Sequence, residues 1–225
     1  MKITGVLVAL VASIGVAAAN PILVNNASFE TLPPGGLPTA CGAPLGCTYS
    51  TGGNIPGWTV TGGDTFTGQL RPGSASGNLT FFNYVPDGLT IGYTDTGMLS
   101  QTVAATAQAG VTYTLLVDVG TRADGFFGGP VVSLVIGGST IAATGSRATA
   151  GNWATYTATY TALAADAGNA IKIQLSSTST QGDFDNVRLS DSLSAGVPEP
   201  GTGMLAVLGL VGFLPVVRAK LRRRA

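Results

Sequence analysis

Short runs of β-forming residues with a period of two, separated by turns, constrain the fold of this chain more than any other feature. Residues 111–119 are rich in Val, Thr, Tyr and Leu, and in residues 153–160 Thr or Tyr recurs at short intervals. The pair Gly137-Gly138 supplies the positive φ angles that a two-residue hairpin loop requires. The sequence contains no heptads and no long amphipathic helical stretch. This pattern predicts an all-β fold.

The pattern predicts nine strands. Their ranges are 57–61, 89–93, 98–103, 112–121, 131–136, 139–144, 154–163, 170–176 and 185–190. Many short strands joined by tight turns are typical of sandwiches and jelly rolls. Charged residues make up only 10% of the chain, which disfavours surface helices. We therefore expect a single jelly-roll β-sandwich over residues 20–190.

The amino-terminal residues have the pattern of a secretion signal. Lys2 precedes an apolar run over residues 3–16, and three alanines end at Ala19. A positive start, an apolar middle and small residues before the cleavage point define a signal peptide. Asn20-Pro21 would stop a helix at the same place. We expect a signal peptide over residues 1–19, cleaved between Ala19 and Asn20.

The carboxyl-terminal residues have the pattern of a membrane anchor. A linker over residues 191–200 leads to an apolar segment, 201–217, and a basic tail, 218–225. At ~1.5 Å per residue the apolar segment is about 25 Å long, close to the ~30 Å hydrocarbon core of a bilayer. Basic tails remain on the cytoplasmic side. We expect a single transmembrane helix that holds an exported domain at the inner membrane during sorting, before it reaches the cell surface or the extracellular space.

Charge and composition exclude several functions. Between residues 20 and 196, five cations face ten acids, a net charge of −5 that repels nucleic acid. The chain contains no histidine, which excludes Ser-His-Asp and Cys-His catalysis and imidazole-bound zinc. Carboxylate pairs remain, and Asp183 with Asp185 or Asp87 with Asp95 could serve a glycoside hydrolase.

The chain end resembles the PEP-CTERM sorting signal of Gram-negative bacteria. The motif Val197-Pro198-Glu199-Pro200, the short apolar span and the arginine cluster occur in the order of that signal over residues 197–225. The resemblance implies processing by an exosortase, in a host that makes extracellular polysaccharide. The alternative is an ordinary membrane anchor without processing.

The folded region resembles galactose-binding-like domains, namely the choice-of-anchor domains and family-4/9-type carbohydrate-binding modules. The motifs that carry this resemblance lie at residues 25–30, 55–58, 99–103, 110–113 and 184–189. It implies a structural Ca²⁺ that joins the first and last strands through Glu30 and Asp185, with Asn26 and Asp183 as further candidates. The alternative is that Glu30 and Asp185 are surface acids without a metal ion.

Aromatic side chains near the predicted loops are candidates for stacking on a sugar ring. These are Trp58, Tyr84, Tyr93, Phe126 and Phe127. Trp58 is equally well interpreted as a core residue. Phe126 and Phe127 are adjacent in a glycine-rich loop, where both cannot easily point into the core.

Cys41 and Cys47 enclose a turn-rich loop, and in an exported domain we expect them to form a disulfide. Closing so small a ring stabilises the fold by about 2 kcal/mol. Together these features lead us to expect a non-catalytic protein of the cell surface or extracellular matrix that binds polysaccharide. The alternatives are a structural or adhesive protein without a small ligand, and the glycoside hydrolase.

Overall fold

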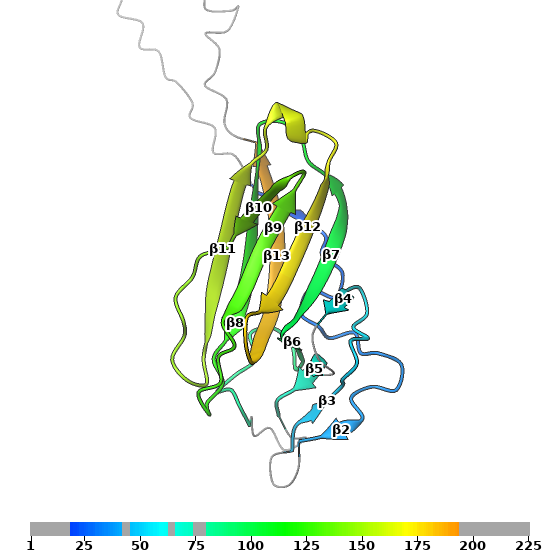
Figure 1. Ribbon diagram of the computed structural model, residues 1–225, viewed down its shortest axis with the longest axis vertical. Coiled ribbons are helices and arrows are strands. Elements are labelled where there is room, and N and C mark those ends of the chain that lie inside the picture. The colour runs from blue at the N-terminus through cyan, green and yellow to red at the C-terminus, as the bar shows by residue number, and fades with distance from the viewer. Residues whose placement is uncertain (1–18, 42–45, 63–65, 74–79, 194–225) are drawn as a thin grey trace, which may run out of the picture. The chain divides into compact units, whose positions relative to one another are not determined.

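The computed structural model describes residues 19–41, 46–62, 66–73 and 80–193, which form two antiparallel β-sheets (Figure 1). The first sheet contains, in spatial order, β11 (Trp153–Thr161), β8 (Val111–Gly120), β13 (Gln181–Leu193), β6 (Ile91–Asp95), β5 (Thr67–Arg71), β3 (Thr48–Tyr49) and β2 (Thr39–Ala40), and β1 (Asn20–Ile22) pairs with β13. The second contains β10 (Ser139–Ala142), β9 (Pro130–Ile136), β12 (Ala170–Ser177), β7 (Gly97–Thr106) and β4 (Thr59–Gly62). Within the described residues the helical structure is one 3-10 turn, η1 (Ala164–Asp166). The predicted all-β sandwich is confirmed.

The nine predicted strands correspond to β4 and to β6 through β13. The four that the pattern missed are β1, β2, β3 and β5, three of which have only two or three residues. β13 begins at Gln181, four positions before the predicted start at Asp185. This longer strand brings Gln181 and Asp183 into the sheet.

The inter-sheet core follows from the period-two patterns. In β8, Val111, Tyr113 and Leu115 are buried at alternate positions, and in β12 the buried residues include Ile171 and Ile173. These side chains belong to one cluster filled from both sheets, which are stacked in Figure 1. The two sheets therefore pack face to face because each buries its apolar face against the other.

A second, smaller apolar cluster lies on the opposite face of the first sheet. Leu70 of β5 pairs with Ile91 of β6, and both belong to this cluster with Tyr93, Phe82 and Trp153. Gly92 lies between Ile91 and Tyr93, and a Cβ there would meet the ring of Phe29 in the inter-sheet core. Because neighbouring residues of a strand face opposite sides, Tyr93 must face away from that core. We call these five residues the outer cluster.

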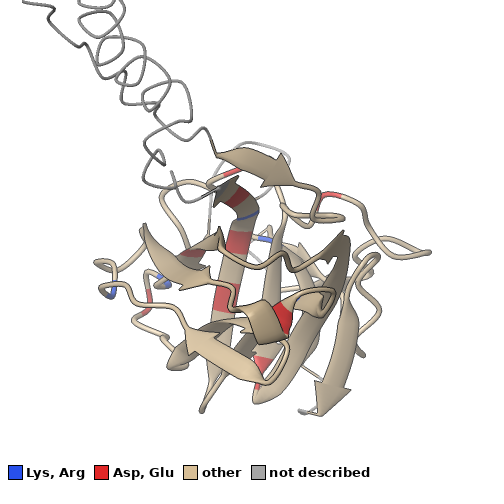
Figure 2. Cartoon of the chain, turned by 90° about the horizontal axis from the view of Figure 1, so that it is seen from above, with Lys and Arg blue, Asp and Glu red and all other residues tan. Residues whose placement is uncertain are grey.

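Charged residues are sparse over the sandwich, but β13 carries three acids, Asp183, Asp185 and Asp191 (Figure 2). No helix in the described part of the chain is long and apolar enough to span a membrane. The predicted signal peptide, Pro-Glu-Pro motif, transmembrane segment and basic tail lie outside the described residues.

Candidate active site

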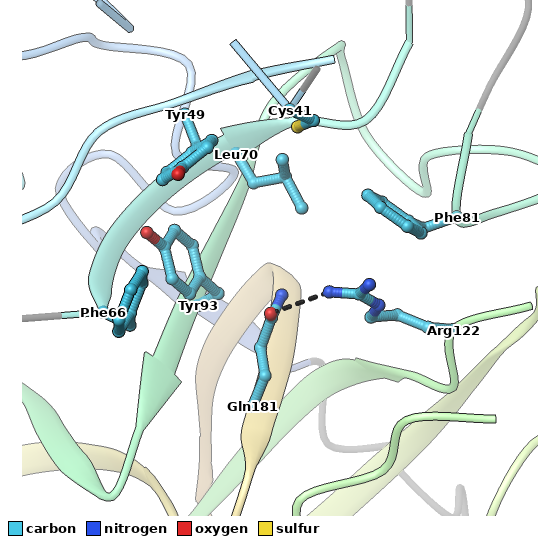
Figure 3. A pocket seen from close by; sticks show the side chains of 8 residues that line it. All are labelled: Cys41, Tyr49, Phe66, Leu70, Phe81, Tyr93, Arg122 and Gln181. Carbon is cyan, nitrogen blue, oxygen red and sulfur yellow. Dashed lines mark hydrogen bonds between the residues drawn. The ribbon is translucent and has the colours of Figure 1, made fainter. Parts of the chain in front are cut away.

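A pocket with a volume of about 260 Å³ opens beside the outer cluster (Figure 3). Its lining residues are Cys41, Tyr49, Phe66, Leu70, Phe81, Tyr93, Arg122 and Gln181. Tyr49, Leu70 and Tyr93 come from the adjacent strands β3, β5 and β6, and the rings of Tyr49 and Tyr93 meet edge to face at 6.5 Å. Phe81 and Arg122 lie across from them in Figure 3. Four of the eight lining residues are aromatic, and Arg122 and Gln181 add a guanidinium and an amide group.

Arg122, two residues after the end of β8, is held in place from several sides. Its Nη2 lies 2.7 Å from Asp124 Oδ2, its Nε donates to Asp124 Oδ1 at 3.2 Å, and its Nη1 donates to Gln181 Oε1 at 2.8 Å. The guanidinium also lies 3.8 Å from the ring centre of Phe81 and 5.2 Å from that of Phe126. Burial alone would raise the pKa of Asp124, but the hydrogen bonds and charge of Arg122 lower it overall. Arg122 therefore enters the pocket as a charge already paired with a carboxylate.

Asp183 lies beside two of the residues that line this pocket, Gln181 and Tyr93. It is fully buried, it pairs with Tyr93 across β13 and β6, and its Oδ1 accepts a 2.7 Å hydrogen bond from Gln181 Nε2. Its Oδ2 has no hydrogen-bond partner among the described residues. Burial raises the pKa of Asp183 to about 7, although Gln181 and the charge of Arg122 favour the ionised form. A carboxyl group of this kind keeps a large share of its protons near neutral pH and can donate a proton.

Asp185, two residues further along β13, belongs to a different environment. Its Oδ2 and Oδ1 accept the backbone N–H groups of Asp87 at 2.9 Å and Asn186 at 2.7 Å. Glu30 Oε1 accepts two backbone N–H groups, from residues 89 and 90. Burial raises the pKa of Asp185 to about 8, and the charges of Asp87 and Glu30 act in the same direction. Asp87 and Glu30 therefore both lie within electrostatic range of Asp185.

The predicted calcium ligands are only partly brought together. Glu30 and Asp185 interact electrostatically, but the Asn26 side chain donates to the carbonyls of Thr31 and Pro56, and Asp183 bonds to Gln181. The described residues contain no group of three carboxylate, histidine or cysteine side chains arranged to bind a metal. Calcium stays a prediction, and the hydrogen bonds of the Asn26 and Asp183 side chains go to groups other than the two main candidates.

The five predicted ligand-binding aromatics lie in different places. Tyr93 lines the pocket, and Phe126 is 48% exposed beside Arg122. Phe127 packs partly against the inter-sheet core, 4.6 Å from the Arg147 guanidinium, so the two adjacent phenylalanines do point in different directions. Tyr84 is 47% exposed. Trp58 is buried and stacks on Phe29 at 5.4 Å, so it is a core residue and presents no ring to a ligand.

The predicted disulfide between Cys41 and Cys47 is confirmed, with the two Cα atoms 5.4 Å apart. Cys41 lines the pocket, and its backbone N–H donates to the Cys47 carbonyl at 3.1 Å. The disulfide therefore holds part of the pocket wall.

Sequence reasoning missed Tyr49, Phe81, Arg122 and Gln181. Tyr49 lies in a two-residue strand, and Phe81 and Arg122 lie in loops that the sheet register brings together. The one available signal was Gln181-Gly182-Asp183, where a polar residue recurs at every second position before the predicted last strand. It indicates that Gln181 and Asp183 share a face.

Comparison with known proteins gives one family and several similar folds. The family model HpiC1-like, described as HpiC1 cyclase, matches residues 20–190. The crystal structure of a cyclase from Fischerella sp. TAU in complex with 4-(1H-indol-3-yl)butan-2-one is 23% identical, with a TM-score of 0.60 over 77% of this chain and 98% of that chain. The apo form of a cyclase from Fischerella sp. is 24% identical, with a TM-score of 0.60 over 78% and 98% of the two chains.

A xylan-binding domain, CBM22-1 of Paenibacillus barcinonensis Xyn10C, is 12% identical, with a TM-score of 0.43 over 80% of this chain and 99% of that domain. No curated protein matches the chain. At 23% and 24% identity the two cyclase structures show a shared fold alone, and the family assignment rests on the family model.

The family model corrects the function expected from the sequence. The expectation of a non-catalytic surface protein is wrong, because the matching family is one of cyclases, which are enzymes. The sequence led away from catalysis because it lacks histidine, whereas a buried carboxyl group can act as an acid without it. The match covers the whole predicted sandwich domain, and the chain belongs to the HpiC1-like family of cyclases.

Proposed function

We propose that this chain is a cyclase that closes a ring in an aromatic, largely apolar small molecule by transferring a proton from Asp183. The observation that carries the proposal is the position of Asp183, which is fully buried beside the pocket residues Gln181 and Tyr93 and has its pKa raised to about 7. Membership of the HpiC1-like cyclase family supports it.

The proposed reaction is an isomerisation. Neutral Asp183 gives its proton to one carbon of a carbon–carbon double bond, which leaves a cation on the neighbouring carbon. A second double bond or aromatic ring of the same molecule supplies the electron pair for the new carbon–carbon bond. The product then loses a different proton to the Asp183 carboxylate or to water, so atoms and charge balance.

The pocket walls suit such a reaction. The rings of Tyr49, Phe66 and Tyr93 lie together in Figure 3, and aromatic faces stabilise positive charge that develops away from water. The volume of about 260 Å³ matches a ligand with the size of a substituted indole. The cyclase from Fischerella sp. TAU was crystallised with an indole that carries a ketone chain, and we propose the same class of ring system for this chain.

Asp183 has no exposed surface, so the reacting carbon reaches it only after a lining side chain moves. Gln181 and Tyr93 are the two lining residues beside it, through a hydrogen bond and through strand pairing. Such closure around the acid also excludes water from the cation.

The test uses indoles that carry unsaturated apolar side chains, with products detected as isomers of unchanged mass. Wild-type protein is expected to convert at least one of them, and Asp183→Asn to convert none. Asp191→Asn is the matched control, because Asp191 lies on the same strand but bonds to Asn20 at the far end.

Full conversion by Asp183→Asn would remove Asp183 from the mechanism. If wild-type protein converts none of the compounds and 4-(1H-indol-3-yl)butan-2-one causes no NMR shift changes at the pocket residues, the aromatic substrate class is wrong. If this ketone binds at the pocket but none of the indoles is converted, the proposed cyclisation is contradicted. The proposal that the pocket binds indole-type ligands would still stand.

We further propose that the cyclase is exported, sorted through its Pro-Glu-Pro segment by an exosortase, and stabilised by calcium near Glu30 and Asp185. The signal-like residues 1–19, the tail 197–225 and the Cys41–Cys47 disulfide support export. Repulsion among Glu30, Asp87 and Asp185 is the feature that a cation would relieve.

A further inference from the structure

Gln181 lies between the two charged ends of a hydrogen-bonded chain. Arg122 Nη1 donates to Gln181 Oε1 at 2.8 Å, drawn as a dashed line in Figure 3, and Gln181 Nε2 donates to Asp183 Oδ1 at 2.7 Å. The Gln181 amide therefore connects the partly exposed guanidinium of Arg122 to the buried carboxyl group of Asp183.

The orientation of this amide follows from donor and acceptor chemistry. A guanidinium has only donors, so the Gln181 atom that faces Arg122 must be the carbonyl oxygen. The NH₂ group is then forced toward Asp183, where it needs an acceptor. The hydrogen bond from Arg122 therefore fixes the orientation of the Gln181 amide, so that its NH₂ group points to Asp183.

The orientation also decides where the acid holds its proton. Asp183 Oδ1 accepts from an N–H group, so a proton on Oδ1 would compete with that contact. Oδ2 has no partner among the described residues, and it is the oxygen that remains for the proton. We propose that Gln181, oriented by Arg122, is a positioning residue that places the Asp183 proton on Oδ2, ready for transfer to a substrate.

This inference rests on the proposed function for the identity of the acid, but the hydrogen-bond chain is independent of any substrate. Arg122 is suited to orient the amide because Asp124 holds two of its nitrogens and Phe81 lies against its face. Without Arg122, the Gln181 amide is free to turn over and present its oxygen to Asp183. That oxygen would accept the acid's proton and keep it from the substrate.

The first experiment measures the hydrogen bond without substrate, by infrared spectroscopy of the full-length chain. The carbonyl stretch of protonated Asp183 is assigned as the band that disappears in Asp183→Asn, recorded at acidic pH, where carboxyl groups hold their protons. Gln181→Met removes the N–H donor and is expected to move this band to higher wavenumber. Gln174→Met is the matched control, a half-buried glutamine on β12 of the other sheet.

The second pair of variants separates orientation from folding. Arg122→Met is expected to change the band as the amide turns over, whereas Arg122→Lys keeps a donor for Gln181 Oε1 and is expected to restore it. The proposal is overturned if the Asp183 carbonyl band of Gln181→Met is the same as that of the wild-type chain. It is also overturned if the band of Arg122→Lys is the same as that of Arg122→Met. Thermal melting confirms that the variants compared are folded.

The activity of the same variants separates this proposal from the proposed function. With an indole that the wild-type chain converts, Gln181→Met is expected to lower kcat by about 100-fold with a smaller change in KM, because the acid loses its hydrogen bond while methionine fills nearly the same volume in the pocket wall. Unchanged kcat in Gln181→Met, with Asp183→Asn inactive, would overturn the positioning role and leave Asp183 as the acid. An active Asp183→Asn would overturn the proposed function, while the infrared bands still test the hydrogen-bond chain.

Discussion

Asp183 combines two properties that a folded protein seldom tolerates together, complete burial and an oxygen without a hydrogen-bond partner in the described chain. Such a group opposes folding when it is ionised, because desolvation penalises the charge. Buried groups with strongly raised pKa values are concentrated at functional sites. At the scale of the residue, Asp183 is therefore the position where stability and activity conflict.

This conflict predicts a pH-dependent stability. Below pH 3.8, the model-compound pKa, Asp183 is neutral in both the folded and unfolded states. Between about pH 4 and pH 7 the unfolded chain loses the proton and the folded chain keeps it, so the free energy of unfolding falls as the pH rises. The raised pKa corresponds to a loss on the order of 4 kcal/mol above pH 7.

Asp183→Asn is accordingly expected to raise the free energy of unfolding at pH 8 by a few kcal/mol and to change it little at pH 4. Urea unfolding at the two pH values measures the difference, with Asp191→Asn as the control. An equal effect of Asp183→Asn at both pH values would show that the carboxyl group titrates normally.

At the scale of the elements, one glycine in β6 separates the two apolar clusters. A Cβ at Gly92 would lie 2.5 Å from the Phe29 ring in the inter-sheet core, while its neighbours Ile91 and Tyr93 serve the outer cluster. Gly92→Ala is expected to destabilise the fold by about 1–3 kcal/mol through overpacking. Gly138→Ala is the control, because nothing lies within 4 Å of its Cβ position. Equal urea midpoints for the two variants would contradict this packing.

Removal of the Cys41–Cys47 disulfide is predicted to weaken both the stability of the fold and the binding of a ligand in the pocket. Replacing Cys41 and Cys47 by serine is expected to lower the free energy of unfolding by about 2 kcal/mol, because the closed ring is small. Binding of 4-(1H-indol-3-yl)butan-2-one should also weaken, because Cys41 forms part of the pocket wall. Calorimetric titration measures the affinity, and an unchanged value in the folded variant would show that the wall does not depend on the disulfide.

The strands with long period-two patterns could be predicted from the sequence, and the short ones could not. β8 and β11 have nine or ten residues in which burial of one face determines the conformation. β2 and β3 have two residues each, and they exist because β3 pairs with β5 and β2 with β3. Such pairing depends on the tertiary fold and leaves no periodic signal in the sequence.

At the scale of the whole molecule, the candidate site is assembled from positions far apart in the chain. Tyr93 was predicted as a ligand-binding aromatic and lines the pocket, and Asp183 was named both as a calcium candidate and, with Asp185, as an acid of a glycoside hydrolase. Arg122 and Gln181 are 59 residues apart, and only the sheet register brings them into contact. The sequence contains the residues of the site, but their convergence depends on how both sheets and the loops pack.

The proposed calcium site also affects the whole molecule. An ion bound by Glu30 and Asp185 would join the first residues of the sandwich to its last strand. Added calcium is expected to raise the melting temperature of the wild-type chain relative to chelator, and to have no such effect on Asp185→Ala. Asp191→Asn should respond like wild type. Identical melting of wild-type protein in calcium and chelator would contradict the clamp.

The most direct test of proton transfer from Asp183 is the mass of the product formed in deuterium oxide. The Asp183 proton exchanges with solvent, so the wild-type chain is predicted to convert a suitable indole into an isomer that retains one deuterium on carbon, and Asp183→Asn to form none. A cyclised product without deuterium, or equal product from Asp183→Asn, would contradict this account.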